Sequence, residues 1–181
     1  LNWYLGINVQ FSNDDNGSSK ITLDQDQYLK EKLIEFEEFI GTGGTATPLP
    51  SNFQSILDSA DDEEDPKFPY REMVGSLMYA MVGTRPDLAF PLQVVCQYMQ
   101  APKRVHCQLV RHIFKYCRFN SYALEYSSEN DMILRGWSDA SYANNQDFKS
   151  TGGSCFKLGG SLLSWSSNKQ NIVALSTAES E

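Results

Sequence analysis

The chain has 181 residues, 41% of them hydrophobic, so it can bury the core of one or two small domains and is not a disordered tail. Its formal net charge of −8 argues against a simple nucleic-acid-coating protein. The charge is uneven, because residues 1–72 hold 15 acids and 5 bases whereas residues 73–181 hold 8 acids and 10 bases, so only the C-terminal half is a candidate phosphate-facing surface.

Four cysteines are spread along the chain without the close paired spacing of zinc sites: Cys96, Cys107, Cys117 and Cys155. Nothing resembles a secretory signal peptide, so we expect these thiols to be reduced and to lie in the protein core. No apolar run approaches the ~20 residues that are needed to span a bilayer. The sequence therefore predicts a soluble, intracellular protein without a membrane partner.

Residues 3–11 alternate apolar and other residues, and a turn-rich stretch then leads to a short strand at 20–23, which predicts a hairpin. Asp24 and Gln27 have the spacing of a capping box and predict a helix that runs to about Phe39. Its buried side would carry Tyr28, Leu29, Leu33, Phe36 and Ile40. Because the chain begins with Leu1 inside a strand pattern, we expect it to be a piece of a longer protein.

Residues 41–69 contain three glycines and two prolines within residues 41–50 and a later acidic run, and they predict a linker with little regular structure. Within this run, Asp61 and Asp62 superficially resemble the paired aspartates of polymerases. Those pairs lie on a hairpin between strong strand formers, whereas these lie among further acids before Pro66. We therefore interpret them as part of a solvated linker.

A helix is predicted from Tyr70 onwards by the helical spacing of Met73, Leu77, Ala80 and Met81. The stretch Gly83–Asp87 ends this helix and starts another, and Pro86 suits a position in a first turn. The residues of this helix pair carry no obvious chemistry, so packing is the simpler explanation of the pattern.

A third helix is predicted over 103–118, and it places four cations on one face: Arg104, Arg111, Lys115 and Arg118. No acid occurs between Asp87 and Glu125. The face is either an ordinary solvated surface or a contact for the phosphates of a template-primer duplex. His106 and His112 lack carboxylate or cysteine partners at useful spacing, so we interpret them as structural or surface residues.

The C-terminal stretch predicts three antiparallel strands, over 132–137, 150–158 and 161–166, with Gly159-Gly160 as a two-residue hairpin turn. Asp139 follows the first strand. Ser176 and Glu179 form a capping box at the start of a helix. Glu181 lies about 200° around the helix axis from Glu179, so its side chain faces elsewhere and is free to contribute to a functional site. Carboxylates such as Asp139 and Glu181 suit a hard divalent cation, Mg²⁺ above all.

Several motifs together resemble one family, the Pol polyproteins of copia-type retrotransposons. In the C-terminal stretch they are Ser138-Asp139-Ala140, Lys149-Ser150-Thr151-Gly152-Gly153, Leu163-Ser164-Trp165, Lys169-Gln170 and the run from Val173 to Glu181. Further upstream they are Tyr70-Arg71, Val74 to Tyr79, Thr84 to Ala89, Leu5-Gly6-Ile7, Ile21 to Gln25 and Tyr28-Leu29.

This resemblance implies an α+β fold with an N-terminal hairpin, a helical region and a truncated ribonuclease H-like sheet that ends at the start of a helix. It implies four regions: the end of a reverse transcriptase palm with the start of its thumb (1–40), a linker (41–69), a helical connection region (70–130) and the N-terminal part of ribonuclease H (131–181). It also implies that Asp139 and Glu181 are catalytic carboxylates that bind Mg²⁺.

The implied parent protein makes DNA from RNA and cuts the RNA of RNA–DNA hybrids in a cytoplasmic particle and the nucleus, with a hybrid or template-primer duplex and the rest of the polyprotein as partners. The polymerase aspartates and later ribonuclease H carboxylates would lie outside this chain, so we expect the chain alone to be inactive. Two alternatives stay open: a non-catalytic nucleic-acid-binding or structural module retained by its host, and a translated relic.

Overall fold

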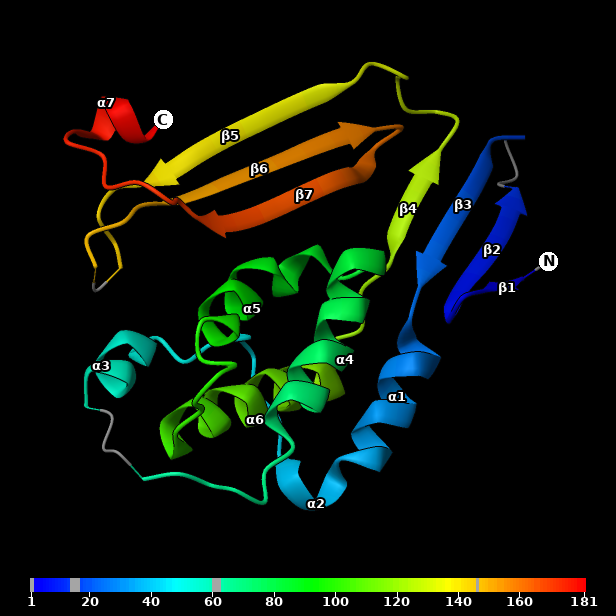
Figure 1. Cartoon of the computed structure of the whole chain (residues 1–181). Helices are drawn as coiled ribbons and strands as arrows, with labels where there is room; N and C mark the ends of the chain where they lie inside the picture. The colour runs from blue at the N-terminus through cyan, green and yellow to red at the C-terminus, as the bar shows by residue number, and fades with distance from the viewer. Residues whose placement is uncertain (1, 14–16, 60–62, 146) are drawn as a thin grey trace. The chain divides into compact units, whose positions relative to one another are not determined.

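The computed structural model describes residues 2–13, 17–59, 63–145 and 147–181, and its internal contacts divide the chain into two compact units. The helical unit comprises residues 3–8 and 24–123, and the sheet unit comprises residue 2 with 9–23 and 124–181. The fold is mixed α and β, as predicted, with a four-stranded sheet of order β1-β2-β3-β4 and a three-stranded sheet of order β5-β6-β7 (Figure 1).

The first predicted strand is in fact two strands, β1 (Trp3–Tyr4) and β2 (Ile7–Asn13), joined by a tight turn. Leu5 and Gly6 form this turn with φ angles of 47° and 73°. Two positive φ angles are typical of a type I′ hairpin turn, in which Gly6 is a favoured residue and Leu5 is not. The expected hairpin then follows with β3 (Ser19–Asp24), which pairs with β4 (Leu124–Ser127) from much later in the chain.

The helical unit is built around three helices: α4 (Tyr70–Gly83), α5 (Ala89–Cys96) and α6 (Arg104–Phe119). The 3-10 helix η1 (Pro86–Leu88) joins α4 to α5, with Pro86 at its first position as predicted. Met73, Leu77 and Ala80 are fully buried. Leu109, Val110, Ile113, Phe114 and Cys117 of α6 belong to the same buried set.

The expected helix after residue 24 forms as α1 (Asp26–Glu35) and a short α2 (Glu37–Ile40), but the predicted capping box is wrong. Gln25 is the N-cap residue, and no side chain caps the helix. The Asp24 carboxylate instead accepts from the Asn8 side-chain amide at 2.9 Å, and Gln27 donates to Glu31 at 2.9 Å. Asn8, which is distant in sequence, and Glu31, one helical turn away, therefore bind the two side chains that were predicted to form the capping box.

The described part of residues 41–69 has little regular structure, as predicted, but parts of this stretch are packed into the helical unit. The stretch contains α3 (Phe53–Asp58), and Leu49, Leu57 and Phe68 are buried in the core of the helical unit. Three apolar residues that are spaced irregularly give no helical period, so the local pattern did not reveal their burial. Asp61 and Asp62 lie outside the residues that the structure describes. The division of the chain into the four regions 1–40, 41–69, 70–130 and 131–181 stays a prediction.

The sheet unit contains the predicted antiparallel meander of β5 (Arg135–Ser141), β6 (Thr151–Leu158) and β7 (Ser161–Lys169), followed by α7 (Thr177–Ser180). Gly159 and Gly160 form the β6–β7 turn with φ angles of 58° and 90°, as a two-residue hairpin requires. A β-bulge between Phe156 and Lys157 shifts the register of β6 against β7.

The apolar run that was expected to open the first of these strands does not belong to it. Met132, Ile133 and Leu134 precede β5 and are exposed. All four cysteines are free. Cys107 and Cys117 are buried as expected, whereas Cys96 and Cys155 are only partly buried, so the expectation that all four lie in the core is wrong for these two. Burial raises the pKa of the Cys107 thiol to about 11 and also raises that of Cys117, so both stay protonated at neutral pH. Among the described residues, no helix is long and apolar enough to cross a membrane.

Candidate metal and nucleic-acid sites

Asp139 lies within β5 rather than after it, opposite Gly153 of β6 in the antiparallel register. Its side chain is exposed, and its Oδ1 atom accepts from the backbone N–H of Ala140 at 2.9 Å. No hydrogen bond of its other carboxylate oxygen is found within the described part of the chain. Since Gly153 has no side chain, the space beside Asp139 on β6 stays open to a ligand.

Helix α7 lies beside β5 at the end of that strand (Figure 1). One of the two hydrogen bonds of the predicted capping box forms at its start: the Ser176 hydroxyl accepts from the Glu179 N–H at 3.2 Å. The Glu179 carboxylate accepts from Leu175 N at 2.6 Å, one residue earlier than an ideal capping box requires. Glu179 therefore has a capping role, and Glu181 ends the chain exposed, with its N–H donating to the Thr177 carbonyl oxygen.

Two bonds from Gln170 fix α7 to the sheet. The backbone N–H of Gln170 donates to the Ser150 carbonyl oxygen at 2.8 Å, and its side-chain amide donates to the Ser180 carbonyl oxygen at 2.7 Å. Ser180 precedes Glu181 directly and is itself buried. Lys169–Gln170, part of the family-like sequence, thus positions the helix end that carries Glu181.

The donor set at this place is chemically suited to Mg²⁺ but small. Carboxylate oxygens are the preferred ligands of Mg²⁺, and Asp139 and Glu181 supply them from neighbouring elements. Among the described residues, no group of three or more His, Cys, Asp or Glu side chains is arranged to hold a metal ion. The two carboxylates fit part of a metal site and not a complete one.

The four predicted nucleic-acid residues all lie on α6, and two of them are held by acids of the preceding segment. Arg104 forms an ion pair with Glu63 at 2.6 Å. Arg111 donates to the Phe39 carbonyl oxygen at 2.7 Å and to Asp65 at 3.1 Å. The guanidinium of Arg111 also lies 4.6 Å from the centre of the Phe68 ring, which adds a cation–π contact.

The other two residues differ from each other. Arg118 donates to the carbonyl oxygens of Gly41 and Gly43 at 2.9 and 3.0 Å. Lys115 is half-buried, and its ammonium has no hydrogen bond or ion pair within the described part of the chain. Three of the four cations therefore fasten residues 39–65 to α6. Whether this face also binds phosphates stays a prediction.

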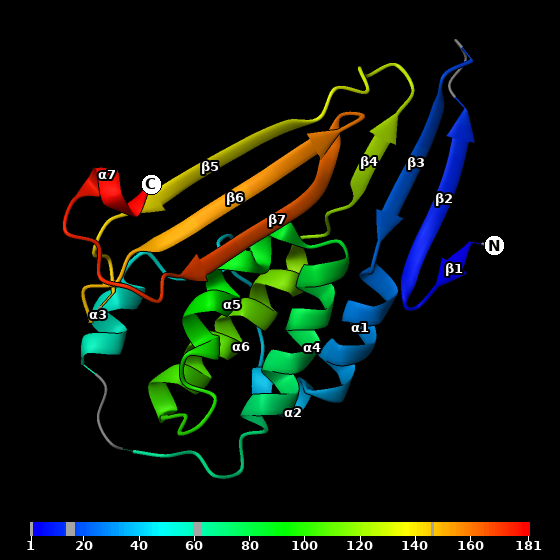
Figure 2. The same cartoon turned by 45° about the horizontal axis from the view of Figure 1, so that its top comes forward.

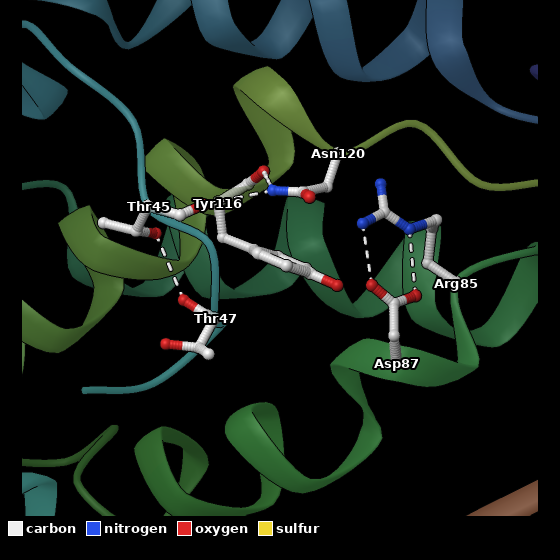
Figure 3. A network of polar contacts seen from close by, with 6 residues as sticks. All are labelled: Thr45, Thr47, Arg85, Asp87, Tyr116 and Asn120. Atoms are coloured by element: carbon white, nitrogen blue, oxygen red, sulfur yellow. Dashed lines mark hydrogen bonds and ion pairs between the residues drawn. The ribbon is translucent and has the colours of Figure 1, made fainter. Parts of the chain in front are cut away.

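Sequence reasoning missed the most buried charged group, which is Arg85 with 1% of its surface exposed. Two of its nitrogens donate to the two Asp87 carboxylate oxygens at 2.9 and 2.7 Å (Figure 3). Burial is the largest single effect and by itself would lower the pKa of Arg85, but the hydrogen bond to Asp87 and the charge interactions with Cys117, Asp87 and Tyr116 together outweigh it, so the net pKa is raised. The Nη1 atom has no hydrogen-bond partner among the described residues.

Aromatic rings and a polar loop surround this pair. The Arg85 guanidinium lies 5.7 Å from the Tyr116 ring centre and 5.3 Å from that of Tyr122. Asn120 donates to the carbonyl oxygens of Tyr116 and Thr45, which ties the 45–47 loop to the end of α6 (Figure 3). A signal was present in Thr84-Arg85-Pro86-Asp87, because an acid two residues from an arginine at a helix corner can form a bidentate pair.

Comparisons with known proteins agree with the motifs. The chain is 35% identical to the retrovirus-related Pol polyprotein from transposon TNT 1-94 of Nicotiana tabacum over 91% of the chain. It is 30% identical to the retrovirus-related Pol polyprotein from transposon RE1 of Arabidopsis thaliana over 100% of the chain. The chain belongs to the family of retrovirus-related Pol polyproteins of copia-type transposons. It spans only 13% and 12% of the length of these two relatives.

A shorter relative has a different name. The chain is 41% identical to the secreted RxLR effector protein 161 of Plasmopara viticola over 62% of the chain, and the match covers 81% of that protein. No protein-family profile matches the chain, and no solved structure matches it.

Proposed function

We propose that this chain is the segment of a retrotransposon Pol polyprotein that joins a reverse transcriptase thumb to ribonuclease H. The parent polyprotein would synthesise DNA on RNA and cut the RNA strand of the hybrid, inside the host cell. The names of the tobacco and Arabidopsis relatives support the Pol part of this proposal. The motif resemblance supports the division into reverse transcriptase and ribonuclease H.

One observation carries the ribonuclease H part: α7, which carries Glu181 at its end, lies beside β5, which carries Asp139. We propose that these carboxylates hold Mg²⁺ in the complete protein. Bound Mg²⁺ would lower the pKa of a water molecule and neutralise charge on the phosphate that is cut. Asp139 would bind through the oxygen that Ala140 does not occupy, while the Gln170 bonds to Ser150 and Ser180 keep α7 in place.

Two carboxylates cannot fix the usual two-metal geometry, so further ligands would come from the rest of the polyprotein. We expect the chain alone to cut no RNA–DNA hybrid in Mg²⁺. In the complete Pol polyprotein, Asp139→Asn should reduce hybrid cleavage by about 10²-fold or more, because it removes a charged ligand, while DNA synthesis continues. A hybrid-cleavage assay and a primer-extension assay on the same preparation measure both activities.

Glu179→Gln is the matched control, because Glu179 lies two residues from Glu181 and has a capping role. A glutamine can keep that role, so this variant should cut the hybrid within about threefold of the wild type. Full cleavage by the Asp139→Asn variant would overturn the assignment, and so would metal-dependent cleavage by the chain alone that persists in that variant.

We also propose a nucleic-acid partner, for which fewer observations speak than for the metal site. An RNA–DNA hybrid or template-primer duplex would contact the α6 face, where Lys115 is the cation without an ion-pair partner among the described residues. Arg104, Arg111 and Arg118 already hold the 39–65 segment, so phosphates would have to compete with those contacts or share them. This favours weak binding by the chain and does not favour a purely nucleic-acid-binding module.

A further inference from the structure

Strand β5 is an outer strand of the three-stranded sheet, because the strand order is β5-β6-β7 (Figure 2). It pairs with β6 along its whole length, from Arg135 to Ser141. In an antiparallel ladder, every second residue directs its N–H and C=O groups to the opposite side of the strand. Within the described part of the chain, no further strand and no loop forms backbone hydrogen bonds with those groups. The outer side of β5 is therefore an open edge about 24 Å long.

This edge lacks several features that keep edge strands from pairing. Its residues include no proline and no lysine. The β-bulge of the sheet lies in the ladder between β6 and β7, so it does not twist the edge of β5 away. Helix α7 lies beside the end of β5, but Gln170 holds it there, and no hydrogen bond among the described residues joins it to the backbone of β5. A further strand can therefore approach β5.

The side chains of β5 determine which strand fits this edge. Arg135, Trp137 and Asp139 are two residues apart and lie on one face of the sheet, and Trp137 is 51% exposed. One carboxylate oxygen of Asp139 accepts from the Ala140 N–H, and the other has no hydrogen bond among the described residues. Arg135 forms an ion pair with Asp131, but both side chains are about half exposed, so this pair contributes little and can be exchanged.

Two copies of this strand complement each other when they run antiparallel about a two-fold axis. In such a pair, residues at equal distances on either side of the axis face each other on the same face of the sheet. With the axis at Trp137, Arg135 faces the partner's Asp139, and Asp139 faces the partner's Arg135. The two Trp137 rings meet at the centre. Opposite charges and aromatic rings directly across strands stabilise a sheet.

The neighbouring registers lose this match. With the axis at Gly136, Arg135 faces the partner's Trp137. With the axis at Ser138, it is Asp139 that faces the partner's Trp137. A cation and an anion at equal distances from a central aromatic residue thus favour a second copy of this chain over a strand of another sequence, which would need a base and an acid at the same two places.

We propose that β5 pairs with β5 of a second copy of this chain in antiparallel orientation, with the two-fold axis at Trp137. The two three-stranded sheets would then form one continuous sheet. Main-chain hydrogen bonds along the joined edges give the affinity, and the side-chain pairs set the register. This association goes beyond the proposed polymerase and nuclease function and does not depend on it.

The test measures the association of the whole chain by sedimentation velocity over an about hundredfold range of concentration. EDTA is present, so the proposed metal role of Asp139 has no influence. The wild-type chain should show a concentration-dependent equilibrium between monomer and dimer. Asp139→Arg places two guanidinium groups opposite each other at both ends of the pair, and Arg135→Asp places two carboxylates there. Each variant should raise the dissociation constant about tenfold or more.

A mixture of these two variants is the sharpest test, because a heterodimer of the Asp139→Arg and Arg135→Asp chains again has an opposite-charge pair at both ends. A fluorescent label on one variant reports the heterodimer. Its dissociation constant should lie within about threefold of the wild-type value.

Glu31→Arg is the matched control. Glu31 is exposed on α1 in the helical unit, and this substitution changes the net charge by the same amount as Asp139→Arg. The control should change the dissociation constant less than about twofold, since salt screens charges that are distant from the contact. A chain with both Arg135→Asp and Asp139→Arg exchanges the two charges and should associate like the wild type.

Three outcomes would overturn the proposal. The first is a wild-type chain that stays monomeric over the whole range of concentration. The second is a dimer that both charge-reversed variants retain, because it would place the contact on another surface. The third is a mixture of the two variants that does not associate although circular dichroism shows both to be folded.

Discussion

The helical unit and the sheet unit hold themselves together in different ways. In the helical unit, α4, α5 and α6 enclose a continuous set of buried apolar residues together with the buried Arg85–Asp87 pair. In the sheet unit, Leu124 and Ala174 are the buried apolar residues among those that the structure describes. Trp137 and Leu163 of its strands are exposed. The sheet unit thus relies on backbone hydrogen bonds and turns, and the helical unit on side-chain packing.

This difference teaches where a substitution will matter. Packed side chains lose contacts when they are truncated, because the surrounding core relaxes only partly. Exposed side chains on a sheet lose little, since water already covers them. Helix content in circular dichroism reports mainly the helical unit. Because Trp3 lies in the helical unit, a Trp3→Phe background leaves the fluorescence of Trp137 and Trp165 to report the sheet unit, so the two responses can be measured separately.

The largest effect is expected at Arg85. Arg85→Met removes one partner of a buried ion pair and leaves the Asp87 carboxylate without its two donors, which should cost about 3–5 kcal/mol of the free energy of unfolding. Chemical denaturation followed by circular dichroism measures the loss. Arg135→Met is the control in the sheet unit, because its ion pair with Asp131 is exposed, and it should cost less than about 1 kcal/mol. Equal costs for the two variants would contradict the comparison.

A smaller effect is expected from acid, again in the helical unit. His106 is buried, stacks on Tyr98 at 3.7 Å and accepts from Lys103 N–H at 2.9 Å. Burial, and then the charge of Lys103, lower the pKa of His106 to about 4. Protonation is thus easier in the unfolded chain, so the stabilisation is complete above pH ~6.5 and is lost as the pH falls towards 4, by up to about 3 kcal/mol.

His106→Gln separates this titration from its structural role. Glutamine at the third position of α6 can still accept from the Lys103 N–H, but it does not titrate. The pH dependence of the denaturation midpoint between pH 7 and pH 4 should therefore become flatter in this variant. His112→Gln, on the same helix, should keep the wild-type slope. A steep slope that persists in His106→Gln would show that another group causes the acid sensitivity.

The smallest effect is expected in the sheet unit. Leu163 of β7 is exposed, so Leu163→Ala should change the free energy of unfolding by no more than about 0.5 kcal/mol. The same truncation in the helical unit, Leu77→Ala, removes a fully buried side chain and should cost about 2–5 kcal/mol. Tryptophan fluorescence and circular dichroism during urea denaturation provide the two measurements. A cost above about 1.5 kcal/mol at Leu163 would show that the sheet packs a core of its own.

Local patterns predicted the parts of the fold whose cause is local. The spacing of Met73, Leu77 and Ala80 set the buried face of α4, Gly159-Gly160 set the β6–β7 turn, and Ser176 set the start of α7. The prediction failed where a distant partner decides. The Asp24 carboxylate bonds to Asn8 and to the N–H of Asp26 and forms no capping box with Gln27. Leu49, Leu57 and Phe68 are buried in a core that residues of α4, α5 and α6 also form.

The same distinction between local and distant causes applies to the candidate sites. Sequence spacing separated the capping role of Glu179 from the free position of Glu181, and the structure confirms the capping role. Spacing also placed the four cations on α6, but it could not show that Arg104, Arg111 and Arg118 have partners 41 to 77 residues away. The metal role of Asp139 and Glu181 stays a prediction, since it depends on ligands beyond those described.

These long-range arginine contacts have a consequence for biosynthesis. Helical proteins usually fold quickly because most of their contacts are local in sequence. Here the hydrogen bond between the Gly41 carbonyl oxygen and Arg118 joins residues that are 77 positions apart. At about 5–20 residues per second, the ribosome synthesises Arg118 about 4–15 s after Gly41. During that interval Leu49 and Leu57 have no core to enter, so the nascent chain offers chaperones an apolar segment that the finished protein hides.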